Sequence, residues 1–404
     1  MANRRVTISP QFFEKLSTVF YLSRIFCLWP VKWENLNYAY GLKKSRTLVA
    51  YSIVTIIFIV TTSIYGLSQL YQVNIIHSVR LGTSAAIYVD AIDVAVVLST
   101  ALIGVFVTSA NIDKFLVYFY HLNQFDHFLN QKDFRCAKFN LVTRSTILYV
   151  TALLIYQTVI WVKLGSRDLN IYSLFFAFFP YHLSYVFTVV LELMYWHLVY
   201  AIKIRMDTIN HKLAKFTENE LSLENEKKIS SVDALNAELF KVKQSTLIFR
   251  IRNITRGYLH LTAAKNSVNQ CYGFIILVVV LGCFLHLLVT PYLLRSIIST
   301  ASESELFIIS QSIWMMGHVL RLFLIVEPCD GCFVQCKNSS LIICNLLCSD
   351  LDREVKKSLK LLLLCLSQCE LDFTAFGLTR IHRRILTAIA GAVTTYLVIL
   401  FQFN

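Results

Sequence analysis

Seven stretches of mostly apolar residues, each long enough to cross a bilayer, constrain the fold of this chain more than any other feature. A bilayer core about 30 Å thick needs about 20 apolar residues, because an α-helix rises about 1.5 Å per residue. The stretches cover residues 47–67, 81–110, 143–162, 171–200, 268–294, 306–326 and 385–403. Apolar residues make up 56% of the chain and charged residues only 16%, which is typical of membrane proteins. We therefore expect an all-α membrane protein with seven transmembrane helices.

The basic residues between these stretches predict how the chain is oriented in the membrane. Of the 38 lysines and arginines, 32 lie before the first stretch or directly after the second, fourth and sixth, and four lie in the other connecting segments. The remaining two are Arg144, at the start of the third stretch, and Arg321, within the sixth. Cytoplasmic loops are enriched in Lys and Arg, so the N-terminus is predicted to be cytoplasmic and the C-terminus extracellular. The net charge of +13 follows from this bias, and we expect no nucleic-acid partner.

The predicted topology divides the chain into four parts. Residues 1–46 form a cytoplasmic segment, and residues 47–327 form a six-helix transmembrane bundle with a cytoplasmic helical extension at 201–265. Residues 328–384 are expected to form a cytoplasmic loop and a helix, and residues 385–404 form the seventh span. The helix expected after Ser349 begins with acidic and basic residues, so it is interpreted as cytoplasmic or interfacial. If it were a span, the C-terminus would lie inside the cell.

Charged residues within the predicted spans are expected to face protein or water. A charge at the bilayer centre costs about 2.5–3.5 kcal/mol on insertion scales. Arg321 is expected to form an ion pair with Glu192 or with Glu327. Asp90 and Asp93 share one helix face in the outer half of the second span, where an external ligand would enter.

Aromatic and polar residues gather in the same outer layer, around Pro180. An apolar cavity with a few polar groups suits a small organic ligand, although many of these side chains would only face lipid. The candidate ligand-binding residues are Asp90, Asp93, Tyr156, Gln157, Trp161, Phe179, His182, Tyr185, His286, Gln311 and Trp314.

Seven of the eleven cysteines lie in the last predicted cytoplasmic segment. Cys329, Cys332 and Cys336 have a spacing that invites a zinc site, but Cys344 and Cys348 follow in an apolar run with no histidine nearby. Reduced thiols are favoured over a metal site, palmitoylation or a redox role. We expect no metal and no other cofactor. No paired carboxylates, nucleophile–histidine set or phosphate-binding loop occurs at suitable spacing, so we expect no enzyme.

The last apolar stretch carries a weakly polar stripe. Gly391, Thr395, Val398 and Gln402 recur every three or four residues, with Ile399 beside them. Such a stripe suits a helix that lines a pore, because a ring of apolar side chains can close the pore by excluding water. A packed bundle helix is an equally good interpretation of these residues alone.

The end of the chain resembles a known family. Thr395-Tyr396, five apolar residues and Gln402-Phe403 are similar to the C-terminal signature of insect gustatory receptors, as is the preceding DFTAFGL at 372–378. The resemblance implies a ligand-gated cation channel of taste neurons in the plasma membrane, assembled as a homo- or heterotetramer. Leu397 replaces an acid that sugar-sensing members tend to carry, which favours a bitter-type or other non-sugar tastant.

The resemblance also implies roles for parts of the chain. Gln402 and Phe403 would form the outer gate with Ile399 next inward, while Thr395 and Tyr396 would support packing between pore helices. The last helices of four subunits would surround the pore, the cytoplasmic helices would anchor the subunits, and the ligand pocket would lie in the outer half of spans two to six. Besides the tastant and related subunits, membrane lipid is the expected partner.

Two other classes of membrane protein remain as alternatives. A seven-helix receptor that signals through G proteins would need an extracellular N-terminus, which the basic N-terminal segment opposes. A secondary transporter usually shows repeated halves with broken helices, and no such repeat is evident in the sequence.

Overall fold

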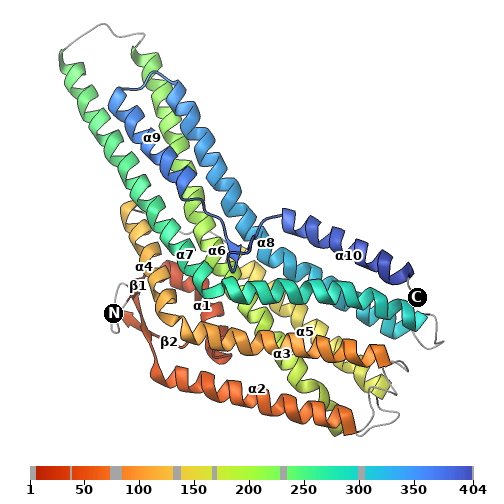
Figure 1. Ribbon diagram of the computed structural model, residues 1–404. Helices are drawn as coiled ribbons and strands as arrows, with labels where there is room; N and C mark the ends of the chain where they lie inside the picture. The colour runs from red at the N-terminus through yellow and green to blue at the C-terminus, as the bar shows by residue number, and fades with distance from the viewer. Residues whose placement is uncertain are drawn as a thin grey trace.

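A computed structural model describes residues 6–36, 39–72, 84–130, 138–165, 171–227, 234–298 and 305–402. Most of these residues are helical (Figure 1). The helices are α1 (Pro10–Ile25), α2 (Arg46–Gln72), α3 (Ser84–Ala110), α4 (Ile112–Phe128), α5 (Lys138–Gly165), α6 (Ile171–Lys227), α7 (Ala234–Ile298), α8 (Glu305–Cys348), α9 (Arg353–Gln368) and α10 (Arg384–Gln402). The strands are β1 (Val6–Ile8), β2 (Val31–Leu36), β3 (Ala39–Lys44), β4 (Thr374–Ala375) and β5 (Thr379–Arg380).

The helices form a bundle and an arm that leaves it at an angle (Figure 1). α2, α3, α5 and α10 lie in the bundle with one half of α6, α7 and α8, and the other halves of these three helices form the arm with α9. α6 has 57 residues and α7 has 65, so both are far longer than a bilayer needs. Both helices run through part of the 201–265 segment, where the sequence predicts a helical extension.

A helix covers each of the seven predicted spans. α2, α5, α6, α7 and α8 each contain a stretch long and apolar enough to cross a membrane. The end of α3 and α4 meet this test together as a pair bent by 65°, and α10 is a shorter apolar helix. The side of the membrane on which each terminus lies stays a prediction.

The sequence interpretation placed a loop after residue 327, but α8 continues to Cys348. Cys329, Cys332 and Cys336 follow helical spacing and are buried against α6 and α7. The Cys329 thiol lies 3.1 Å from the Tyr195 hydroxyl, and the Cys336 thiol lies 3.6 Å from the Tyr258 hydroxyl. These cysteines therefore behave as small apolar core residues of a helix. Within the described ranges, no group of three or more potential metal ligands occurs.

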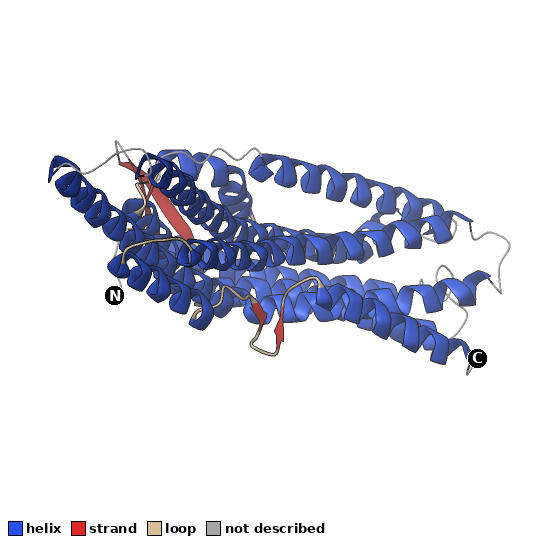
Figure 2. Cartoon of the chain, turned by 90° about the horizontal axis from the view of Figure 1, so that it is seen from above, coloured by secondary structure: helices blue, strands red, loops and turns tan. Residues whose placement is uncertain are grey.

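The N-terminal segment departs from the all-α expectation, because it contains a small antiparallel sheet in the order β1-β3-β2 (Figure 2). The β2–β3 hairpin pairs Trp33 with Leu42, and Phe13 of α1 stacks on Tyr40 with ring centroids 3.9 Å apart. The Trp29 indole N–H donates to the Tyr272 hydroxyl at 2.8 Å. The segment is therefore packed within itself by aromatic rings and hydrogen-bonded to α7 rather than left as a free tail.

The DFTAFGL motif supplies β4 and the turn of the β4–β5 hairpin, which lies between α9 and α10. Phe376 and Gly377 both have positive φ, at 54° and 76°, as the two central residues of a type I′ turn require. The Asn269 amide of α7 bridges the hairpin, since it donates to the Asp372 carbonyl at 3.2 Å and accepts from the Thr374 N–H at 3.3 Å. The hairpin thus ties the connection into α10 to α7.

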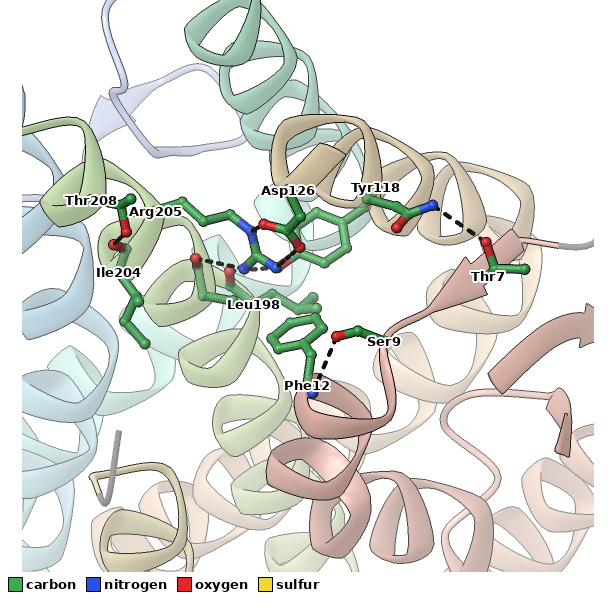
Figure 3. Close-up of polar contacts among 11 residues, drawn as sticks. Thr7, Ser9, Phe12, Tyr118, Asp126, Leu198, Ile204, Arg205 and Thr208 are labelled. Carbon is green, nitrogen blue, oxygen red and sulfur yellow. Dashed lines mark hydrogen bonds and ion pairs between the residues drawn. The ribbon is translucent and has the colours of Figure 1, made fainter. Parts of the chain in front are cut away.

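A buried ion pair joins α4 to α6 at the start of the arm (Figure 3). The Arg205 guanidinium donates to both carboxylate oxygens of Asp126, at 2.9 and 2.7 Å, and to the Ala201 carbonyl at 3.0 Å. It also lies 4.5 Å from the ring centre of Phe12. Burial raises the pKa of the Asp126 carboxyl above its usual value, and the charge of Arg205 offsets part of this rise. The pair therefore locks α1, α4 and α6 together.

A histidine pair between α4 and α7 makes stability depend on pH. The Nδ1 atoms of His121 and His260 lie 3.0 Å apart, and burial lowers both pKa values from 6.5. The unfolded chain binds more protons below pH 6.5 than the folded chain, so the free energy of unfolding falls as the pH falls. We expect a lower Tm at about pH 5.5 than at about pH 7.5.

Purified protein in detergent would show this difference, and the variant with both His121→Asn and His260→Asn should lose most of it. His127→Asn is the matched control, because His127 is exposed on the same helix α4. An unchanged pH dependence in the double variant would contradict the assignment.

Candidate functional site

A group of aromatic side chains joins α6, α7 and α8 in the half of the bundle that was predicted to be extracellular. Tyr185 and Trp314 lie at its centre, with ring centroids 4.6 Å apart. Tyr181 and His286 approach the same Trp314 ring at 5.8 and 6.5 Å. Three of the predicted ligand-binding residues, Tyr185, His286 and Trp314, are thus brought together.

α5 adds a polar contact beside this aromatic group. The Gln157 amide accepts from the Ser310 hydroxyl at 2.9 Å and donates to the Ser310 carbonyl at 3.4 Å. Ser310 precedes Trp314 by one helical turn, so Gln157, another predicted residue, lies next to the aromatic group. Both side chains are buried, so this contact holds α5 against α8.

Three buried polar atoms near the aromatic group have no hydrogen-bond partner among the described residues: the hydroxyls of Tyr149 and Ser184 and Nε2 of His318. Buried polar groups are nearly always paired, so such atoms are candidates for binding a ligand. Gly317 packs here, since a Cβ at this position would lie 2.8 Å from the Tyr149 hydroxyl. Tyr149, Ser184 and Gly317 were not predicted, because no pattern in the sequence reports an unpaired atom.

A charged network lies under the aromatic group. Arg321 donates to Glu192 from Nε at 2.9 Å and from Nη2 at 2.6 Å. Of the two partners expected for Arg321, the structure therefore shows Glu192. The Arg321 Nη1 lies 3.3 Å from Nδ1 of His318, whose ring stacks on His286 at 3.9 Å. Charge pairing of this kind makes buried charges tolerable in an apolar bundle.

The remaining predicted ligand-binding residues fall into three groups. Phe179 packs on Phe175 at 5.4 Å, and His182 lies beside Tyr181. Tyr156 and Gln311 are half-buried. Three further candidates have side chains outside the described residues, and these are Asp90, Asp93 and Trp161.

One face of α10 packs on its own chain and the opposite face does not. The half-buried residues Leu386, Ile389, Val393 and Leu397 recur at helical spacing on the first face. The predicted stripe of Gly391, Thr395, Val398 and Gln402 is exposed, as are Tyr396 and Ile399, whereas Phe403 lies outside the described residues. The stripe is therefore free to contact another molecule.

The sequence profile of the family described as 7tm chemosensory receptor matches residues 16–404. The chain belongs to the 7tm chemosensory receptor family. It is 26% identical over 419 residues to "Gustatory receptor for sugar taste 43a" of Drosophila melanogaster, across 96% of this chain and 97% of that protein. "Putative gustatory receptor 28b" of the same fly is 27% identical over 147 residues, which cover 35% of this chain and 31% of that protein.

The fold of this chemosensory receptor is similar to that of the insect olfactory receptor OR5 from Machilis hrabei, solved with and without eugenol. The eugenol complex matches with a TM-score of 0.55 and 14% identity, over 97% of this chain and 99% of that chain. The resemblance to insect gustatory receptors is thus supported at the level of the family. A member of this family is a membrane receptor, and nothing in the family description indicates an enzyme.

Proposed function

We propose that this receptor is a ligand-gated, non-selective cation channel of taste neurons, opened by a small organic tastant bound in the outer half of the bundle. The observation that carries the proposal is the set of unpaired polar atoms of Tyr149, Ser184 and His318 beside the Tyr185–Trp314 rings. Aromatic walls with a few polar groups suit a small organic molecule. A ligand that prefers the open state by about 2.7 kcal/mol would shift the equilibrium about a hundredfold.

The exposed stripe of α10 supports a pore shared between subunits. A homo- or heterotetramer would bring the stripes of its subunits together, with Ile399, Gln402 and Phe403 as the gate and Thr395 and Tyr396 supporting the packing of the pore helices. The exposed apolar side chains of α10 would otherwise face lipid. The receptor would act in the plasma membrane, with the arm joining the subunits on the cytoplasmic side.

The observations bear in opposite directions on whether the ligand is a sugar or a non-sugar tastant. Leu397 favours a bitter-type or other non-sugar tastant, whereas the relative that aligns over nearly the whole chain is named for sugar taste. The first screen should therefore record currents with hexoses and with aromatic bitter compounds. A response to hexoses alone would overturn the non-sugar proposal and leave the channel proposal intact.

The side of the membrane on which each terminus lies distinguishes the channel proposal from the G-protein-coupled alternative. We expect an epitope tag after Asn404 to be reached by antibody on intact cells, and a tag before Met1 only after permeabilisation. An extracellular N-terminus would favour the G-protein-coupled alternative. A cytoplasmic C-terminus together with a cytoplasmic N-terminus would mean that α10 does not span the membrane alone, and the pore assignment would fail.

The pocket assignment predicts the effect of Gly317→Ala. The added Cβ would lie 2.8 Å from the Tyr149 hydroxyl and 3.6 Å from that of Tyr185, so the ring of Tyr149 must move. We expect the half-maximal concentration of agonist to rise about tenfold with the maximal current retained, since one methyl group in a fitted pocket changes binding by 1–3 kcal/mol. Ser312→Ala, at an exposed position of α8, is the control. Equal agonist sensitivity of Gly317→Ala and wild type would remove this region from the pocket.

A further inference from the structure

A cleft lies in the arm, between the end of α4 and the arm portions of α6 and α7. Its volume is about 450 Å³, within the range of about 300–1,000 Å³ common for small-molecule sites. Its lining has two parts: the cations Lys212, Lys215 and Arg250, and the apolar side chains of Phe128, Phe216 and Ile254.

The three cations of this cleft lack acidic partners. Among the described residues, no carboxylate lines the cleft and none of the three cations forms an ion pair. Lys212 donates to the Leu129 carbonyl at the end of α4, at 2.7 Å, and burial and the charge of Arg250 lower its pKa. Three positive charges that line one cleft favour the binding of an anion.

The apolar part of the cleft offers a fixed aromatic surface. The Phe128 ring stacks on His260 with centroids 5.5 Å apart and an angle of 18°, and Phe216 is only 7% exposed. The half-buried amide of Asn253 also lines the cleft, and it can both donate to and accept from the edge of a heterocycle. Aromatic faces, an amide and several cations together match an anion that carries a planar organic part.

We propose that this cleft binds an organic phosphate of the nucleotide class, with its phosphates on Lys212, Lys215 and Arg250 and its base against Phe128 and Phe216. Such a ligand would join α4 to α6 and α7, and the latter two helices run from the arm into the bundle. Its binding would couple the receptor to the supply of a phosphorylated metabolite inside the cell. The cleft is separate from the Tyr185–Trp314 group, so this site does not depend on the proposed channel function.

The depth of the cleft favours a soluble ligand over a lipid headgroup. Lys212 follows the end of the fourth predicted span by 12 residues, and Arg250 precedes the fifth by 18. At 1.5 Å per residue these positions lie about 18 and about 27 Å from the spans along the helices. The headgroup layer of one leaflet is only about 5–8 Å thick, so a lipid held in the bilayer would not reach the cations.

Binding to the purified full-length receptor in phosphatidylcholine nanodiscs, measured by calorimetry without any tastant, tests the site. The probes are ADP, adenosine, inorganic phosphate, inositol hexakisphosphate and a dioctanoyl phosphoinositide. We expect ADP to bind at least about tenfold more tightly than adenosine or inorganic phosphate. Adenosine lacks the phosphates, and inorganic phosphate lacks the base. The variant with both Lys215→Gln and Arg250→Gln should bind ADP at least about tenfold more weakly.

Arg252→Gln is the matched control, because Arg252 is exposed on α7 but does not line the cleft. Lys215 and Arg250 are also exposed, so size-exclusion profiles should show that the double variant still folds. Equal ADP affinity of the double variant and wild type, or no binding of ADP at all, would overturn the proposal. Tighter binding of inositol hexakisphosphate would overturn the base contact, and tighter binding of the phosphoinositide would assign the site to a lipid.

Discussion

Replacing Arg321 by methionine is expected to destabilise the receptor by about 3–5 kcal/mol, enough to remove most folded protein from the cell surface. The substitution would leave the Glu192 carboxylate, whose side chain is fully buried, without the guanidinium that donates to it at 2.6 and 2.9 Å. A buried charge without a partner is among the most costly changes in a protein core. The Tm of a fluorescent fusion, followed by size-exclusion chromatography in detergent, would measure the loss.

The double variant Glu192→Leu with Arg321→Met separates pairing from packing. It removes both charges and keeps apolar volume, so we expect it to recover most of the lost Tm. Glu327→Gln is the control, because Glu327 is 45% exposed in its ion pair with Lys203, and such a pair contributes less than about 1 kcal/mol. A wild-type Tm for Arg321→Met would show that the pair does not hold α6 to α8.

The positions of the apolar helices could be predicted from the sequence, because the thickness of the bilayer sets a minimum length for each span. The sheet of β1, β2 and β3 cannot be predicted in the same way, since its strands are short and they pack on α1 and α4, which are separate helices in the sequence. The helical course of α8 beyond Glu327 was not predicted, although Cys329, Cys332 and Cys336 recur at the spacing of one helix face. Spacing and apolar neighbours decide such cases better than residue type.

The candidate site was readable only in part. An ion pair of Arg321 could be predicted, since a charge within a span needs a partner, but the sequence left Glu192 and Glu327 as alternatives. The meeting of Tyr185, His286 and Trp314 depends on how α6, α7 and α8 are rotated about their axes, which their sequences alone do not specify. The unpaired hydroxyl of Tyr149 is a property of the packed site and has no counterpart in the sequence.

The gate prediction concerns two exposed residues of α10, and we expect Ile399→Ala or Gln402→Ala to raise the current recorded without ligand. If these side chains close the pore, their loss weakens the closed state. A change of about 1.4 kcal/mol would raise a small open fraction about tenfold. Ile399 is 41% exposed, so truncating it removes little packing within the chain, and surface expression should be retained.

Leu397→Ala distinguishes a gate from a general weakening of α10. Leu397 lies on the opposite face, where α10 packs on its own chain, so its truncation should lower the Tm without raising the basal current. A rise in basal current for all three variants would mean that any loosening of α10 opens the channel, and the stripe would have no special role. Unchanged currents in Gln402→Ala would remove Gln402 from the gate, while a response confined to Ile399→Ala would place the constriction one turn further inward.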